Sequence, residues 1–126
     1  NIGSSVPSIA YQNEIVSPSE NTTYDAKIGL MYASDYGFAA SPSAWSTTLF
    51  DYQKVTANNW MYMGDYDWTI SRDSDNSDRA FVVSHDGSMR YDNNTGYNAV
   101  RPSFNLSSSI TYVSGSGSAV DPILIN

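Results

Sequence analysis

The chain of 126 residues contains no cysteine and a single histidine, His85. The absence of cysteine excludes disulfide bonds, thiolate metal sites and a cysteine nucleophile, although it does not fix the cellular compartment. His85 precedes Asp86 and Gly87 in an expected turn, and the sequence offers it no obvious Ser or Cys partner for acid–base chemistry. We therefore expect a protein that is not an enzyme.

Positive charge and long apolar runs are scarce as well. The chain has six Lys and Arg residues and thirteen Asp and Glu residues, so its net charge is -7. A nucleic-acid-binding protein normally carries the opposite sign, so we exclude nucleic acid as a partner. A run of about 18 apolar residues is missing, so we expect no membrane span within this chain. The start lacks Met and resembles no signal peptide, which indicates a processed product or a part of a longer protein.

Uncharged polar residues and aromatic residues are abundant. Only 15% of the residues are charged, so Ser, Asn, Thr and Tyr cover most of the expected surface. This composition is typical of an extracellular protein at a bacterial cell surface. Ten Tyr, four Phe and three Trp suit both a core and contact surfaces. We expect Trp45, Trp60 and Trp68 to lie in the core.

The chain divides into a polar start and one domain. We expect residues 1–23 to form an extended N-terminal lead-in with one edge strand near residues 8–15, and the alternative is a flexible arm. Residues 24–126 have the size of a single domain. Within it, Ser34 followed by Asp35 predicts a short helix over residues 35–40.

The remaining elements are mostly predicted strands. Runs of strand length, several rich in β-branched and aromatic residues, cover residues 27–32, 60–63, 67–71, 80–84 and 100–106. Asp86 and Gly87 predict the turn of a hairpin, whereas residues 43–59 predict a loop with helical turns. Residues 109–113 and 119–125 predict a C-terminal hairpin that turns at Gly115 and Gly117. The predicted fold class is α+β, mostly β.

Three segments in this order resemble a known group of proteins. They read Trp-Thr-Ile-Ser from Trp68, Ala-Phe-Val-Val-Ser-His-Asp-Gly-Ser from Ala80, and Val-Arg-Pro-Ser-Phe-Asn-Leu from Val100. Together they resemble the formylglycine-generating-enzyme branch of the C-type lectin fold, which implies a C-type-lectin-like domain. Catalysis in that branch is similar to copper-and-cysteine chemistry. Because this chain has no cysteine, the resemblance does not carry that activity over.

A narrower resemblance covers residues 27–126. The run from Lys27 to Ala39, the pair Asn59-Trp60 and the tail from Gly115 to Ile123 resemble the C-terminal domain of Firmicutes pilin-like (prepilin-type) surface proteins. Members of that family also carry a hydrophobic N-terminal helix, which this chain does not contain. The resemblance implies the globular head of a pilin-like subunit.

Three tyrosines and three asparagines, all but one of them in the polar loop of residues 91–98, are the candidate binding residues. Tyr rings and Asn amides suit a contact surface for a glycan or a protein. The alternative is that most Tyr are half-buried around a small β core. The candidate ligand-binding residues are Tyr66, Tyr91, Asn93, Asn94, Tyr97 and Asn98.

The acidic residues suggest two further sites, each with a plainer alternative. Asp73, Asp75 and Asp78 lie within six residues and suit Ca²⁺, which prefers oxygen ligands. Their alternative is a solvated acidic loop beside Arg72 and Arg79. Paired carboxylates at Asp65 and Asp67 suit glycoside hydrolysis, and their alternative is a polar strand edge.

One cation lies in an apolar strand. Arg101, between Val100 and Pro102, predicts a buried or half-buried guanidinium that binds backbone carbonyls or an acid. Taken together, the sequence predicts a non-enzymatic display and structural module. We expect it to bind no cofactor, and calcium at Asp73, Asp75 and Asp78 is the one alternative to this. Its expected partners are like subunits in a filament. The alternatives are an adhesin or receptor-binding domain with a glycan or protein ligand, and a glycoside hydrolase.

Overall fold

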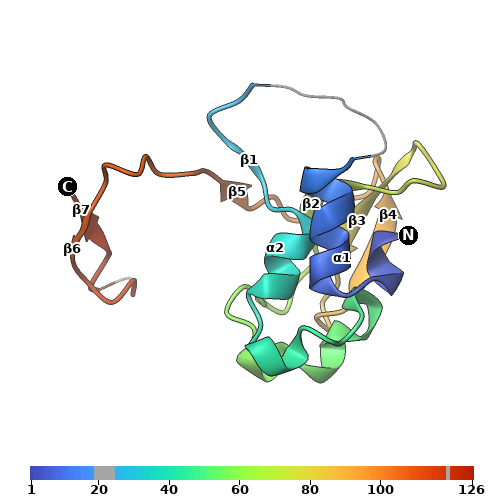
Figure 1. Cartoon of the computed structure of the whole chain (residues 1–126), viewed down its shortest axis with the longest axis horizontal. Coiled ribbons are helices and arrows are strands. Elements are labelled where there is room, and N and C mark those ends of the chain that lie inside the picture. The colour runs from blue at the N-terminus through green and yellow to red at the C-terminus, as the bar shows by residue number, and fades with distance from the viewer. Residues whose placement is uncertain (19–24, 119) are drawn as a thin grey trace.

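The computed structural model describes residues 1–18, 25–118 and 120–126 (Figure 1). The helical elements are η1 (Ile2–Ser4), α1 (Pro7–Tyr11), η2 (Gln12–Val16), α2 (Ala33–Phe38), η3 (Pro42–Ala44), η4 (Leu49–Lys54) and η5 (Thr56–Asn58). The strands are β1 (Gly29–Leu30), β2 (Asp67–Arg72), β3 (Arg79–Val83), β4 (Met89–Asn93), β5 (Pro102–Ser103), β6 (Tyr112–Ser114) and β7 (Leu124–Ile125). Helix and strand are mixed in about equal fractions, so the α+β class is confirmed and its description as mostly β is wrong.

The centre of the molecule is an antiparallel three-stranded sheet in the order β2-β3-β4. Its strands follow the predicted runs at residues 67–71 and 80–84. The predicted turn is confirmed at Gly87, whose φ of 86° favours glycine. In β4, Tyr91 pairs with Phe81 and Met89 pairs with Val83. Helix α2 packs against β2 and β3, and α1 packs against α2.

Strand β2 is bulged, and its buried face is polar. Trp68 pairs with Val82 but Arg72 already pairs with Ala80, so four steps of β2 span two steps of β3. The hydroxyl of Thr69 fills the gap and donates to the carbonyl of Phe81 over 2.8 Å. Polar residues of β2 therefore face the core: Asp67, Thr69 and Ser71.

The predicted positions of the tryptophans are wrong. Trp68 and Ile70 share one face of β2 as the alternation suggests, but Ile70 is exposed and Trp68 is half-buried. Trp45 is also exposed, although its indole Nε1 donates to the carbonyl of Ala40 over 2.9 Å. Trp60 is 80% exposed. The expected strand over residues 60–63 is a turn, because the chain only bridges Ala40 at Asn59 before it reverses.

The extended lead-in is also wrong over the residues that the structure describes. Residues 2–4 and 7–16 are helical, and Pro7 begins α1, where its fixed φ suits a helix start. Ala10 is fully buried against the rest of the chain. Residues 19–23 of the predicted lead-in, and the expected boundary at residue 24, lie outside the described residues.

The predicted short helix exists but begins two residues earlier than expected. Tyr32 is its N-cap, and the carboxylate of Asp35 accepts the backbone N–H of Tyr32 over 2.8 Å. An acid in the first turn also stabilises the positive end of the helix dipole. Residues 42–58 contain three short 3₁₀ helices, in agreement with the predicted loop with helical turns.

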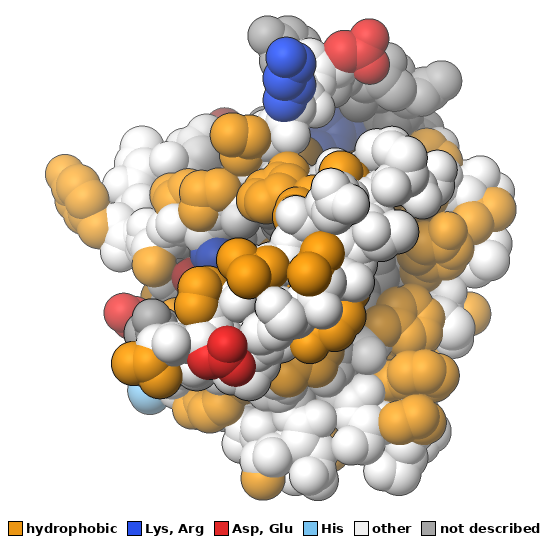
Figure 2. Space-filling view, turned by 90° about the vertical axis from the view of Figure 1, so that its left-hand side faces the viewer, with side chains coloured by type: hydrophobic (Ala, Val, Ile, Leu, Met, Phe, Trp, Pro, Cys, Tyr) orange, Lys and Arg blue, Asp and Glu red, His pale blue; other side chains and the backbone are white. Residues whose placement is uncertain are grey.

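The C-terminal hairpin is confirmed, and it stands away from the rest of the molecule. Strands β6 and β7 pair antiparallel, with Tyr112 opposite Ile125, and Gly115 and Gly117 have positive φ. β5 pairs with β1 in a two-stranded sheet, so Pro102 occupies a short edge strand, where its missing N–H is tolerated. From there an extended segment leads to the hairpin (Figure 1). Figure 2, seen from the hairpin side, shows hydrophobic side chains spread over this face.

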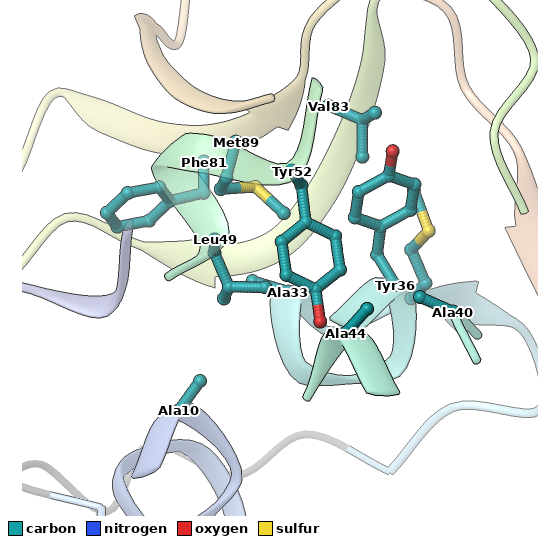
Figure 3. Close-up of a cluster of buried hydrophobic side chains, with 11 residues drawn as sticks. Ala10, Ala33, Tyr36, Ala40, Ala44, Leu49, Tyr52, Phe81, Val83 and Met89 are labelled. Carbon is teal, nitrogen blue, oxygen red and sulfur yellow. The ribbon is translucent and has the colours of Figure 1, made fainter. Parts of the chain in front are cut away.

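The core lies between the helices and the sheet (Figure 3). Tyr36 and Tyr52 are fully buried there, with ring centroids 5.9 Å apart. Their hydroxyls donate to the carbonyls of Gly87 and Gly37 over 2.8 and 2.9 Å, so no buried O–H of this pair is left unsatisfied. Burial raises the pKa of Tyr52 to about 12 and that of Tyr36 further.

Candidate functional site

The loop after β4 holds most of the side chains that are predicted to contact a ligand. Tyr97 is fully exposed, and Asn93 and Asn94 are exposed as well. Asn98 uses its amide within the loop, where Nδ2 donates to Oδ2 of Asp92 over 2.9 Å. The hydrogen bond of Asn98 thus holds the loop against β4, and the ring of Tyr97 is exposed to solvent.

This loop is joined to the acidic loop between β2 and β3. The N–H of Asn94 donates to the carbonyl of Asp78 over 2.8 Å. The guanidinium carbon of Arg79 lies 4.8 Å from the centroid of the Tyr91 ring. Because Arg79 and Asn93 are register partners, both loops lie at the same end of the sheet. The structure gathers five of the six predicted residues at this end: Tyr91, Asn93, Asn94, Tyr97 and Asn98.

Tyr66 stands apart from this group, at the opposite end of the sheet. It precedes Asp67, which pairs with Val83 beside the β3–β4 turn. Its hydroxyl lies 3.0 Å from Nδ1 of His85, and the two ring centroids are 5.2 Å apart. The side chain of Tyr66 thus faces His85, while its backbone meets the far end of the loop after β4, where its carbonyl accepts the N–H of Ala99 over 2.8 Å.

His85 lies among polar groups of the β3–β4 turn. Its Nδ1 is also 3.4 Å from the hydroxyl of Ser84. The neighbouring carboxylate of Asp86 accepts hydrogen bonds from both the hydroxyl and the N–H of Ser88, and these bonds lower the pKa of Asp86. Asp86 thus stabilises the turn.

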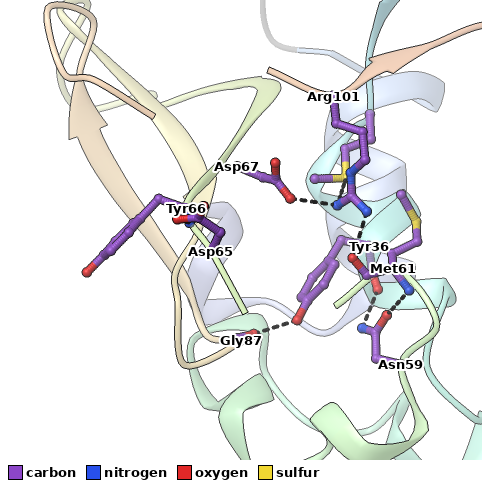
Figure 4. A network of polar contacts seen from close by, with 9 residues as sticks. Tyr36, Asn59, Met61, Asp65, Tyr66, Asp67, Gly87 and Arg101 are labelled. Atoms are coloured by element: carbon purple, nitrogen blue, oxygen red, sulfur yellow. Dashed lines mark hydrogen bonds and ion pairs between the residues drawn. The ribbon is translucent and has the colours of Figure 1, made fainter. Parts of the chain in front are cut away.

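A half-buried guanidinium anchors the strand that follows the loop (Figure 4). Nη1 of Arg101 donates to the carbonyl of Met61 over 2.8 Å, and Nη2 lies 2.9 Å from Oδ2 of Asp67 and 3.7 Å from the sulfur of Met31. Burial raises the pKa of Asp67, and the positive charge of Arg101 opposes that shift. The prediction that Arg101 binds a carbonyl and an acid is confirmed.

The two carboxylates suggested for glycoside hydrolysis are engaged separately. Asp67 is buried and directed at Arg101, whereas Asp65 is exposed and accepts the N–H of Tyr66 over 2.8 Å. Asp65 lies on the solvent side of this segment and Asp67 on the core side. Asp67 therefore contributes an ion pair with Arg101, whereas Asp65 contributes a hydrogen bond to the backbone of Tyr66.

The acidic loop of residues 73–78 is folded by its own side chains. Oδ1 of the buried Asp73 accepts the N–H of Asp75 over 3.2 Å, and Oδ1 of Asn76 accepts the N–H of Asp78 over 2.9 Å. Within the described residues, no group of three or more His, Cys, Asp or Glu side chains is placed to hold a metal ion. Calcium binding here stays a prediction, and a melting temperature that rises with Ca²⁺ in the wild type but not in Asp75→Ala would establish it.

Sequence reasoning missed a half-buried acid in the N-terminal segment. Glu14 in η2 accepts the N–H of Ser34 over 3.1 Å and the hydroxyl of Ser71, whose oxygen in turn accepts the N–H of Ala33 over 2.9 Å. Burial raises the pKa of Glu14 despite these hydrogen bonds. The signal in the sequence was an acid followed directly by the apolar Ile15 and Val16.

An open hollow of about 550 Å³ lies beside β4 and η4. Arg90 lines it, donates to the carbonyl of Phe50 over 3.0 Å and lies with its guanidinium carbon 5.7 Å from the Phe50 ring centroid. Of the predicted ligand-binding residues, the hollow contains Tyr91. It is lined by Phe50, Asp51, Gln53, Arg90 and Tyr91.

A different surface carries large apolar side chains in solvent. The bond from Arg101 to Met61 brings the segment around residue 100 against residues 60–63. Trp60, Met63 and Val100 are 80%, 68% and 65% exposed there. We call these three residues the Trp60 surface. Large exposed apolar groups that cluster are typical of protein interfaces, in which Trp and Met are enriched.

Comparisons of the chain with protein-family models, with curated proteins and with solved structures gave no match. In the described part of the chain, no helix is long and apolar enough to cross a membrane. The function must therefore be argued from the residues and their arrangement.

Proposed function

We propose that the chain is a non-enzymatic display and structural module of a bacterial cell-surface protein, the globular head of a pilin-like filament subunit. The Trp60 surface is the observation that carries this proposal. Side chains that would be buried in a self-sufficient monomer are held in solvent on a firmly anchored segment. Burying them against a like subunit is favourable at about 25 cal/mol per Å² of apolar surface.

The resemblance of the segments around Trp68, Gly87 and Arg101 supports the finer part of the proposal, a C-type-lectin-like domain of the pilin-like kind. The anchored Arg101 gives that resemblance a physical basis, because it ties the Val-Arg-Pro segment to the strand that begins at Asp67. An acidic surface rich in Ser, Asn, Thr and Tyr supports an extracellular location.

Immunogold electron microscopy of the source bacterium tests this proposal. Antibodies against the chain should label structures outside the cell envelope on intact cells. Permeabilised cells serve as the control for the antibody. Label that appears only after permeabilisation would contradict the extracellular assignment.

The alternative is a glycan- or protein-binding module, and the exposed Tyr97 beside Asn93 and Asn94 favours it. Such a site stacks a ring on the ligand and binds it with amides. On a glycan array, saturable binding that Tyr97→Ala removes would support an adhesin. Tyr112→Ala is the matched control, because Tyr112 is an exposed tyrosine in the hairpin.

A further inference from the structure

One wall of the open hollow beside β4 is formed by the 3₁₀ helix η4. Because a 3₁₀ helix has about three residues per turn, residues three apart share a face. Leu49 and Tyr52 form the buried face of η4. Phe50 and Gln53 form a second face, which lines the hollow. Gln53 is exposed, and its amide has no hydrogen-bond partner within the described residues, so it is available to a ligand.

The opposite wall is the outer edge of β4, which is the last strand in the order β2-β3-β4. At the β3–β4 turn, the N–H of Ser84 donates to the carbonyl of Ser88 over 2.8 Å. Hydrogen-bonded and non-hydrogen-bonded pairs alternate in an antiparallel ladder. Tyr91 is opposite Phe81, three pairs further along, so these two residues form a non-hydrogen-bonded pair. The N–H and the carbonyl of Tyr91 therefore point away from β3, toward the open edge.

Neighbouring main-chain groups along this edge are already bonded within the chain. The carbonyl of Met89 accepts Nη1 of Arg90 over 3.0 Å. The N–H of Asn93 donates to Oδ1 of Asp92 over 2.8 Å. An extended peptide would need these groups to add a strand to the sheet. A compact ligand fits the edge better, because it needs only the N–H and the carbonyl of Tyr91.

Two fixed charges of opposite sign border the hollow. Arg90 is held in place because Nη1 donates to the carbonyls of Met89 and Phe50, each over 3.0 Å. Its Nε and Nη2 donors have no hydrogen-bond partner in the part of the chain that the structure describes. Asp51 accepts Nζ of Lys54 over 2.9 Å, and this hydrogen bond lowers the pKa of Asp51. The hollow therefore offers a carboxylate and a guanidinium with free donors.

This set of groups suits a neutral sugar better than an ion. The charges of Arg90 and Asp51 offset each other, so the lining favours neither an anion nor a cation. A hydroxyl both donates and accepts, so neighbouring hydroxyls of a pyranose can donate to the carboxylate and accept from the guanidinium. The exposed ring of Tyr91 offers an apolar surface to the C–H face of the sugar.

We propose that the hollow between η4 and β4 binds a neutral hexopyranose residue of a glycan through Asp51, Gln53, Arg90 and Tyr91. Because the hollow is open, the rest of the glycan continues into solvent. This inference goes beyond the proposed function, since it does not require like subunits to pack. It also differs from the alternative at Tyr97, which does not line the hollow.

Amide NMR spectra of the isotope-labelled full chain, titrated with methyl glycosides, test the proposal. The neutral probes are the methyl glycosides of glucose, galactose, mannose, N-acetylglucosamine and N-acetylgalactosamine, and methyl glucuronide is the acidic counterpart. We expect saturable shifts at the amides of Gln53 and Tyr91 and at the Nε–H of Arg90 with at least one neutral probe, which binds at least as tightly as the glucuronide. The absence of such shifts with every neutral probe, or tighter binding of the glucuronide, would overturn the proposal.

Single substitutions place the sugar in the hollow or elsewhere. Asp51→Asn should weaken binding about tenfold, since a hydrogen bond to a charged group is stronger than one to an amide. Lys54→Ala is the matched control, because it removes the exposed ion pair but keeps the carboxylate. Gln53→Ala should weaken binding about two- to tenfold, whereas Tyr97→Ala should leave it unchanged. Binding that survives Asp51→Asn at full strength, or that Tyr97→Ala abolishes, would show that the sugar lies outside the hollow.

Discussion

The guanidinium of Arg101 joins three segments that are far apart in the sequence. It contacts Asp67 in β2, the carbonyl of Met61 in the turn after Asn59, and the sulfur of Met31 beside β1. Asp67 is buried, and this burial raises the pKa of its carboxyl group. The cation therefore compensates a charge that water does not reach.

Replacing Arg101 by Met should lower the free energy of unfolding by about 3 kcal/mol, since the buried carboxylate of Asp67 would lose its partner. Guanidinium chloride denaturation measures this change. Arg79→Met is the matched control, because Arg79 packs on Tyr91 nearer the surface and its loss should cost about 1 kcal/mol or less. Equal losses in the two variants would show that the Asp67–Arg101 pair has no special role.

The contribution of Glu14 to stability falls as the pH rises, which is opposite to the contribution of a carboxyl group whose pKa is lowered in the folded state. Because burial raises its pKa, the folded protein keeps this proton to higher pH than the unfolded chain does. Its contribution to stability is greatest below the usual value of 4.5 and falls as the pH rises through the folded value. Glu14→Gln should therefore gain stability relative to the wild type as the pH increases from about 4 to about 7.

Asp86→Asn provides the contrast for this experiment. Hydrogen bonds from Ser88 lower the pKa of Asp86, so its contribution is present above the usual value of 3.8 and is lost as the pH falls. Asp86→Asn should therefore lose stability relative to the wild type as the pH rises through the acid range up to the usual value of 3.8, and should then stay level while Glu14→Gln still gains. Thermal melts from about pH 2 to about pH 7 measure both, and parallel profiles for the two variants would contradict the opposite signs.

At the scale of elements, the N-terminal helices are an integral layer of the fold. A Cβ on Gly37 of α2 would lie 2.7 Å from the ring of Pro7 and 3.0 Å from Leu49. Gly37→Ala should therefore destabilise the protein by about 1–3 kcal/mol through overpacking. Gly29→Ala is the control, because a Cβ there meets nothing within 4 Å. Chemical denaturation compares them, and a Gly37→Ala variant as stable as Gly29→Ala would mean that α1 does not pack on α2.

The elements that could be predicted from sequence are those whose signals are local. The β3–β4 hairpin has consecutive β-branched residues and an Asp-Gly turn, and the C-terminal hairpin has glycines between two apolar runs. The N-terminal segment has a weak local pattern, so its helical form depends on packing of Ala10 and Pro7 against α2. In β2, Thr69 and Ser71 are buried while Ile70 is exposed, against the usual rule that the apolar face is buried.

At the scale of the whole molecule, the chain has a packed body and a C-terminal hairpin that stands away from it. Arg101 in an apolar strand could be predicted to bind an acid, because a cation there needs a partner. Glu14 could not be paired with Ser34 and Ser71, because those contacts arise only when three distant segments meet. The exposure of Trp60 could not be predicted either. Its hydrophobicity indicates that burial is favourable, but not whether the chain itself or another molecule buries it.

The central claim is that apolar groups exposed on one copy are covered by another. Amide hydrogen exchange of the full chain at low and high protein concentration tests it most directly. We predict that protection increases with concentration in residues 60–63, while α1 serves as an internal reference that stays unchanged. Exchange rates that are independent of concentration in residues 60–63 would contradict the account.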